Sequence, residues 1–258
     1  QSYTLIDDSR DSEAIFKNQQ LVNTHNANND FTMQYFGLAE REQLITALIG
    51  ACPQHEASIR FLLDRAHWGD LPTYGLSRTL AILLGIGKRV VVYDDDVLCE
   101  AVRAPLPGMG VQFGSITGRF AKFWESAPAQ APDKRPMPDN PTALITRQLG
   151  QTLGHGLKSL THGSASPHSV ANANGAFLGS LTAHSKILQT QCGTWGDPGT
   201  SGGHWIAELD LESIDRLLDT PGGVTNAVDA RACWLGYATP TLTKTGVMSQ
   251  VTGYDATQ

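Results

Sequence analysis

The sequence predicts an α/β fold, in which a central mixed and mostly parallel sheet is flanked by helices. Short apolar strands alternate with amphipathic helices over residues 3–100, and two of these strands, 3–6 and 89–93, run directly into aspartates. Alternating strands and helices place parallel strands side by side and cover the sheet with helices. The 258 residues are enough to bury a substantial core in one domain.

Composition indicates a globular protein that does not bind nucleic acid. Apolar residues make up 41% of the chain and charged residues 17%, with a formal net charge of -6. A nucleic-acid surface needs clustered Lys and Arg to neutralise phosphates, and an acidic chain offers few of them. A small anionic ligand still fits, because a bound metal ion or a few cationic groups can hold one diphosphate.

The sequence favours a cytoplasmic protein with no membrane span of its own. No stretch approaches the roughly 20 apolar residues of a spanning helix, and the N-terminus has no signal pattern. The four cysteines are scattered, which favours reduced thiols. The chain opens on 3–6, which resembles a strand already under way, and it ends just after a polar segment, 253–255, that we expect to form a turn. We therefore expect a trimmed domain whose membrane association would need a missing segment or a partner.

The first elements are a strand, a polar segment and a helix. Residues 3–6 form an apolar strand that ends in Asp7 and Asp8. The polar segment 11–30 is rich in Asn and Gln, and its sequence fits either a helix with a loop or a loose excursion. Residues 38–50 carry apolar side chains at helical spacing and end at a glycine, so they predict an amphipathic helix.

A second strand, a helix and a third strand follow. The apolar run 57–63 predicts a strand that ends in Asp64. Leucines at helical spacing predict a helix over 74–88, and 89–93 predicts a strand that ends in Asp94–Asp96. This order implies that the three strands lie parallel in one sheet.

The rest of the chain is less regular. Prolines and glycines over 105–141 indicate an irregular excursion. Residues 144–160 are compatible with a helix weakened by three glycines, and 208–218 predicts a helix with one apolar side. Residues 163–175 form a loop rich in Ser and Asn. His155, His162 and His168 lie in or near it and could approach a ligand, but solvated histidines are the simpler interpretation.

Acidic residues follow each predicted strand. Ligands of parallel α/β sheets bind outside the carboxyl ends of the strands. Asp94–Asp96 is the most informative group, because three adjacent carboxylates repel one another unless a cation or donors compensate. In an extended segment Asp94 and Asp96 point the same way. A divalent ion that carries a diphosphate explains this group, and a solvated acidic turn is the alternative.

These motifs resemble those of GT-A-fold glycosyltransferases related to family 2. The resemblance covers residues 3–100: a strand ending in Asp7–Ser9, a helix, a strand, the helix segment Gly75–Ala81 and a strand ending in Asp94–Asp96. It implies a GT-A (nucleotide-diphospho-sugar transferase), Rossmann-like sheet. It also implies one domain over 1–258, with residues 1–104 as the nucleotide-binding half and 105–258 as the acceptor-side half.

The resemblance assigns roles to residues of the nucleotide-binding half. Asp7 and Asp8 would contact the base or ribose, and Arg78 would lie near the diphosphate. Asp7 and Asp8 could instead cap the following segment, and Arg78 could form a surface ion pair. Asp64 with Arg65 is more simply interpreted as a local ion pair.

The resemblance also assigns the metal to Asp94–Asp96, as Mn²⁺ or Mg²⁺. Asp96 would be the direct ligand and Asp94 would support it, whereas Asp95 would point toward the sugar or ribose. The metal would be bound together with a UDP- or GDP-linked sugar.

On the acceptor side, 175–179 and 246–255 resemble the small-residue segments that line the acceptor in this family. The loop 193–203 carries Trp195, which with Trp205 could stack on a sugar ring, although a buried tryptophan is the simpler interpretation for Trp205. The family's first strand has no counterpart before residue 3, and the motif that supplies the base would follow the last residues. Asp255 and Asp197 are the available candidates for the catalytic base.

We therefore expect a metal-dependent transferase that moves a sugar to a carbohydrate or other hydroxyl acceptor, in polysaccharide or glycoconjugate synthesis. A phosphohydrolase of the haloacid dehalogenase type is one alternative, although Val97 and Leu98 replace its usual Gly-Thr pair. A module that binds a nucleotide sugar or glycan without turnover is another.

Overall fold

A computed structural model defines two compact units, Gln1–Ile86 and Gly87–Gln258. The boundary differs from the expected division at residue 104, so Asp94–Asp96 belongs to the second unit. The structure describes residues 2–69, 71, 73–104, 110–114, 119–123, 136–160, 168–170, 173–195, 206, 209, 211–219, 233–237, 240–243 and 251–257.

The first unit opens with a β–α–β arrangement. Strand β1 (Tyr3–Ile6) pairs in parallel with β2 (Met33–Phe36), and α1 (Ser12–Asn28) connects them. The side chain of Asp11 caps α1 by accepting a hydrogen bond from the backbone N–H of Ala14 at 2.9 Å. The strand 3–6 is confirmed, the open interpretation of 11–30 is resolved as a helix, and β2 was not predicted.

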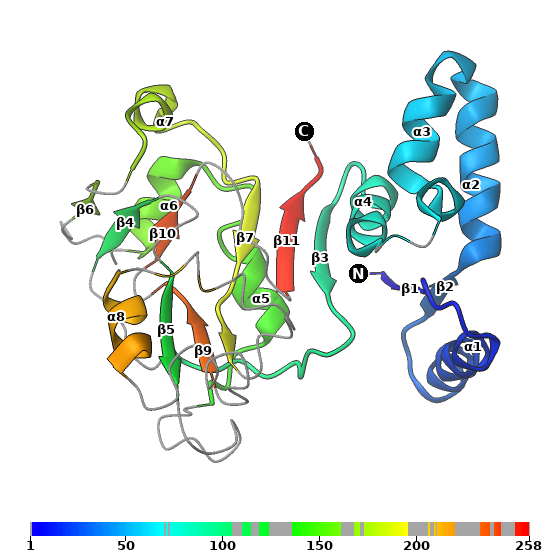
Figure 1. The fold of residues 1–258 in the computed structure, drawn as a ribbon, viewed down its shortest axis with the longest axis horizontal. Coiled ribbons are helices and arrows are strands. Elements are labelled where there is room, and N and C mark those ends of the chain that lie inside the picture. The colour runs from blue at the N-terminus through cyan, green and yellow to red at the C-terminus, as the bar shows by residue number, and fades with distance from the viewer. Residues whose placement is uncertain are drawn as a thin grey trace. The chain divides into compact units, whose positions relative to one another are not determined.

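Helices cover the sheet on both sides (Figure 1). Helix α1 lies on one side, and α2 (Leu38–Ala51), α3 (Glu56–Leu63) and α4 (Tyr74–Leu84) lie on the other. Two short 3-10 helices, η1 (Pro53–His55) and η2 (Arg65–Trp68), join the three helices. The predicted helices 38–50 and 74–88 are confirmed, the latter ending four residues early.

The core of this unit lies between the sheet and these three helices. Ile45, Leu63 and Leu80, one from each helix, are almost fully buried in contact with one another, and Ile6 and Phe36 pack against them from the strands. Burial of such side chains is the main source of stability for the unit.

The prediction of a strand over 57–63 is wrong, because these residues form α3. Arg60 bonds Glu56 at 2.9 Å and Asp64 at 3.0 Å, both four residues away and therefore on the same side of a helix. A helix also buries Leu63 while Phe61 on the other side is 50% exposed. Asp64 therefore follows a helix and not a strand.

In the second unit, β3 (Arg89–Tyr93) is confirmed as a strand, but its predicted parallel pairing is wrong. It pairs antiparallel with β11 (Val251–Asp255), which in turn pairs antiparallel with β7 (Gln189–Gln191). The three strands lie side by side, and α5 (Pro141–Thr146) packs against them (Figure 1). The expected turn over 253–255 is therefore part of a central strand.

The other strands of the second unit are short. The parallel pairs are β10 with β4 and β4 with β6, and the antiparallel pairs are β5 with β9 and β9 with β8. Their bounds are β4 Val111–Phe113, β5 Phe120–Phe123, β6 His168–Ser169, β8 Thr194–Trp195, β9 Cys233–Gly236 and β10 Thr241–Leu242. The described strands thus form four small sheets, which confirms the α/β class.

The remaining helices are α6 (Leu153–Leu160), α7 (Gly175–Ser180) and α8 (Leu211–Asp219). The predicted helix 144–160 is thus divided into α5 and α6. Gly150 lies between them with φ +74°, a left-handed conformation that a continuous helix cannot contain. No helix within the described ranges is long and apolar enough to cross a membrane.

Candidate functional site

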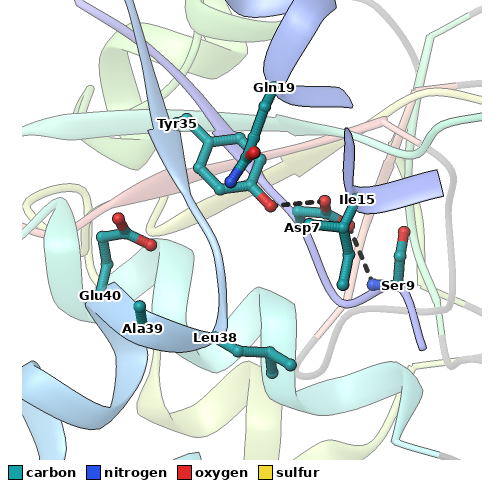
Figure 2. A pocket seen from close by; sticks show the side chains of 8 residues that line it. All are labelled: Asp7, Ser9, Ile15, Gln19, Tyr35, Leu38, Ala39 and Glu40. Atoms are coloured by element: carbon teal, nitrogen blue, oxygen red, sulfur yellow. Dashed lines mark hydrogen bonds between the residues drawn. The ribbon is translucent and has the colours of Figure 1, made fainter. Parts of the chain in front are cut away.

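The carboxyl ends of β1 and β2 form a small pocket, which we call the strand-end pocket. It has a volume of about 160 Å³ and is lined by Asp7, Ser9, Ile15, Gln19, Tyr35 and the first residues of α2, Leu38–Glu40 (Figure 2). Parallel pairing brings the two strand ends together, which explains why residues 28 positions apart in the chain meet here.

Asp7 is the central polar group of the strand-end pocket. Its side chain is only 4% exposed, and Oδ2 accepts a hydrogen bond from the Tyr35 hydroxyl at 2.7 Å (Figure 2). Oδ1 accepts from the backbone N–H of Ser9 at 2.9 Å. Gly37 makes room for the Tyr35 ring, because a Cβ at position 37 would lie 2.6 Å from Tyr35 Cε1.

These contacts fix the ionisation of both side chains. Burial alone would raise the pKa of Asp7, but hydrogen bonds from Ser9 and Tyr35 outweigh it and lower the pKa below its usual value. Burial, the hydrogen bond to Asp7 and the charge of that carboxylate raise the pKa of Tyr35 to about 12. At neutral pH the strand-end pocket therefore holds a carboxylate and a neutral phenol.

Asp8 has a structural role. Arg41 Nη1 donates to its Oδ1 at 2.7 Å, Thr73 Oγ1 donates to its Oδ2 at 3.0 Å, and Arg65 Nη1 donates to its backbone carbonyl at 2.7 Å. The Arg41 side chain is 2% exposed, so its charge depends on Asp8 for compensation. Asp8 thus ties the end of β1 to α2, η2 and the residue before α4, and both of its carboxylate oxygens are occupied.

The other acidic and basic residues expected in this half lie elsewhere. Asp64 caps η2 by accepting from the Ala66 N–H at 2.8 Å, and it pairs with Arg60 instead of the expected Arg65. Arg78 lies in the second turn of α4 and is half-buried. The position of Arg78 beside a diphosphate stays a prediction.

Asp94–Asp96, the acidic triplet, follows β3 directly. The backbone N–H of Val97 donates to the Asp94 carbonyl at 3.4 Å, so the triplet forms a turn and the expected extended alternation of Asp94 and Asp96 does not apply. Asp94 is half-buried, and Asp95 and Asp96 are exposed. The Tyr93 and Thr142 hydroxyls, 2.7 Å apart, fix the end of β3 to the first turn of α5.

The donor set of the acidic triplet suits Mn²⁺ or Mg²⁺. These ions prefer oxygen ligands and take only one or two protein carboxylates when they also bind a diphosphate. No group of three or more His, Cys, Asp or Glu side chains in the described part of the chain is arranged to hold a metal alone. Metal binding at the triplet therefore stays a prediction.

Asp255 lies at the opposite end of the sheet from the acidic triplet. The register places Asp255 beside Arg89 and Val251 beside Tyr93. Five residues separate Arg89 from Asp94, which at about 3.4 Å each is roughly 17 Å. Hydrogen bonds from Thr257 and the nearby positive charges lower the pKa of Asp255 below its usual value. Asp255 is thus too distant from the triplet to accept a proton in a reaction there.

Several expected residues are peripheral or outside the described residues. Trp195 is half-buried in β8, and His155 is exposed on α6. The second base candidate, Asp197, and Trp205 lie outside the described residues, as does most of the loop 193–203. Their expected roles stay predictions.

Sequence reasoning missed Tyr35, Glu40 and Arg41. Arg41 and Glu40 are charged residues of an amphipathic helix, and only the pairing of β1 with β2 brings that helix to Asp7 and Asp8. One signal was available: Glu40 is the third residue after Gly37, the spacing of a capping box, and its Oε2 accepts from the Gly37 N–H at 2.9 Å.

No family model matches the chain, and the comparisons with curated proteins and with solved structures gave no match. The features available for a functional assignment are therefore the strand-end pocket in the first unit and the acidic triplet in the second.

Proposed function

We propose that this chain is a metal-dependent glycosyltransferase, with a GT-A-type arrangement, that transfers a sugar from a nucleotide-diphosphate donor to a hydroxyl acceptor. The observation that carries the proposal is the acidic triplet, with two exposed carboxylates, directly after a strand that is fixed to α5. A metal that carries a diphosphate takes only one or two carboxylates from a protein, and the exposed end of β3 can supply them.

The acidic triplet would hold the metal through Asp96, supported by Asp94. Because the triplet forms a turn, the direction of Asp95 toward the sugar or ribose stays a prediction. A bound Mn²⁺ or Mg²⁺ would supply neutralisation of the charge that develops on the departing diphosphate. The triplet's own contribution would be to hold two carboxylates at a fixed strand end. The diphosphate leaving group would then be positioned while the acceptor attacks the anomeric carbon.

Contact of Asp7 with the base or ribose of the donor stays a prediction. The strand-end pocket, with a volume of about 160 Å³, belongs to the first unit and the acidic triplet belongs to the second. The proposal rests on the acidic triplet alone.

The acceptor hydroxyl must lose a proton as it attacks the anomeric carbon, and a carboxylate is the usual recipient in such reactions. Asp255 is unsuited to this role by its position, and Asp197 stays a prediction. The distance of Asp255 from the triplet favours a second candidate function, a module that binds a nucleotide sugar without turnover. Release of free nucleotide diphosphate from the donor in the presence of Mn²⁺ would identify the enzyme and contradict the module.

The metal assignment is tested by calorimetric titration of the full chain with UDP and GDP, with and without Mn²⁺. An Asp94→Ala/Asp96→Ala variant should lose at least tenfold in Mn²⁺-dependent affinity, because the metal loses its protein ligands. An Asp215→Ala/Asp219→Ala variant removes the same charge from the exposed side of α8 and should bind like the wild type. Binding that is equal in both variants, or no nucleotide binding at all, would overturn the proposal.

A further inference from the structure

The strand-end pocket presents two carboxylates to a ligand. Asp7 and Glu40 both line it, and Asp7 is almost fully buried (Figure 2). Glu40 Oε2 accepts from the Gly37 N–H at 2.9 Å, whereas its Oε1 has no hydrogen bond to a described residue. Each Asp7 oxygen accepts one protein hydrogen bond, but a carboxylate has about four lone-pair sites. Both side chains can therefore accept hydrogen bonds from a ligand.

The wall of the pocket supplies no positive charge to balance these carboxylates. None of the described residues that line it is Lys, Arg or His. The Tyr35 hydroxyl already donates to Asp7 at 2.7 Å and is hydrogen bonded with Gln19. Burial, the hydrogen bond to Asp7 and the charges of Asp7 and Glu40 raise the pKa of Tyr35 to about 12, so both negative charges act at this hydroxyl. A cationic ligand would therefore be attracted by both carboxylates, and an anionic ligand would be repelled.

The rest of the wall favours an organic cation over a metal ion. Ca²⁺ and Mg²⁺ take about six or more oxygen ligands, but the side chains of Ile15, Leu38 and Ala39 offer only carbon. The face of the Tyr35 ring can also attract a cation. The volume of about 160 Å³ is roughly five times the ~30 Å³ that one molecule of liquid water occupies, which suits a group of a few heavy atoms. An ammonium group on a short apolar chain matches such a wall.

We infer that the strand-end pocket binds a small organic ammonium ion, a primary amine whose N–H groups donate to the Asp7 and Glu40 carboxylates. Its carbon chain would pack against Ile15 and Leu38. An ammonium group has three donors and no acceptor, so it complements a wall whose free polar groups are carboxylate oxygens. The inference concerns the first unit alone and goes beyond the proposed function, which rests on the acidic triplet in the second unit.

The inference is tested by nuclear magnetic resonance titration of the isotope-labelled full chain with n-butylammonium, n-butanol and butyrate at neutral pH and equal ionic strength. The three probes have similar size and differ in charge. The backbone amides of Ser9 and Gly37 donate to the Asp7 and Glu40 carboxylates, so their resonances report on the pocket. n-Butylammonium should shift both resonances saturably, and butyrate should shift neither. A hydrogen bond to a charged group corresponds to roughly tenfold to a hundredfold in affinity, so n-butylammonium should bind at least tenfold more tightly than n-butanol.

Two variants make the test specific to the carboxylates of the pocket. Glu40→Gln retains an oxygen that can accept from the Gly37 N–H but loses the negative charge, so its affinity for n-butylammonium should fall at least tenfold. Glu42→Gln removes the same charge from an exposed position of α2 and should bind n-butylammonium like the wild type. Thermal unfolding of each variant verifies that the fold is kept.

Three outcomes would overturn the inference. The first is that n-butylammonium causes no saturable shift of the Ser9 and Gly37 amides, or binds no more tightly than n-butanol. The second is that Glu40→Gln keeps the wild-type affinity. The third is that Glu40→Gln and Glu42→Gln weaken binding equally, which would indicate a general attraction to an acidic surface. Each of these outcomes leaves the proposed function standing, because the acidic triplet lies in the other unit.

Discussion

At the scale of single residues, two adjacent carboxylates have different roles because they face different elements. Asp7 points toward β2 and the strand-end pocket, where Tyr35 is its partner. Asp8 points toward the helices, where it compensates the buried Arg41. Successive side chains of an extended segment alternate in direction, so two adjacent aspartates can contact different elements.

The lowered pKa of Asp7 predicts how the free energy of unfolding depends on pH. Because this pKa is lower in the folded protein, Asp7 adds stability above its unfolded value of about 3.9, and that stability is lost as the pH falls through the folded value. Asp7→Asn should cost about 1–3 kcal/mol at pH 7 and should show a weaker loss of stability between pH 5 and 2 in urea unfolding. Asp30→Asn, at an exposed position, should retain the wild-type dependence of stability on pH. If the stability of Asp7→Asn fell as steeply between pH 5 and 2 as that of the wild type, the lowered pKa of Asp7 would be contradicted.

Sequence alone located part of this chemistry. An apolar strand that ends in aspartates is a local pattern, so Asp7, Asp8 and Asp94–Asp96 could be predicted as candidates. Their partners, Tyr35 for Asp7 and Arg41 for Asp8, come from β2 and α2 and depend on strand pairing, which no local pattern specifies.

At the scale of elements, the predictions succeeded where apolar residues recur at a clear helical or strand spacing, and they failed where this spacing is ambiguous. The apolar run in α3 fits a strand or a buried helix equally well. The ion pairs of Arg60 join residues four positions apart, which is the spacing of a helix. β11 was not recognised as a central strand because Gly253 resembles a turn residue. A Cβ there would lie 2.6 Å from Thr190 Oγ1, so glycine serves close packing at this position.

Gly150, between α5 and α6, is a position where a side chain should not be tolerated. It has φ +74°, and a Cβ at this position would collide with the Asp255 carboxylate and lie 2.8 Å from Arg89 Nη2. Gly150→Ala should therefore destabilise the protein by about 1–3 kcal/mol. Gly50→Ala, inside α2 with open space around its Cβ, should instead stabilise it by about 0.5–1 kcal/mol. Equal effects of the two changes in urea unfolding would contradict this account.

At the scale of the whole molecule, the chain has two units whose described cores share no residue. Ile45, Leu63 and Leu80 form the core cluster of Gln1–Ile86, and Ala121, Leu209 and Leu235 form one in Gly87–Gln258. A hydrophobic core holds together the elements that contribute to it. We therefore expect that the strand-end pocket depends on the first core and that the stability of each unit can be altered separately.

Hydrogen exchange can test this independence. Leu80→Ala and Leu209→Ala each empty space in one core and should each cost about 2–5 kcal/mol of local stability. Leu80→Ala should accelerate amide exchange within residues 1–86, and Leu209→Ala within residues 87–258, because local unfolding follows cooperative units. Exposed Leu62→Ala and Leu218→Ala are the matched controls and should change neither pattern. If either core variant accelerated exchange along the whole chain, the two units would unfold together. A change in the strand-end pocket would then also alter the stability of the acidic triplet.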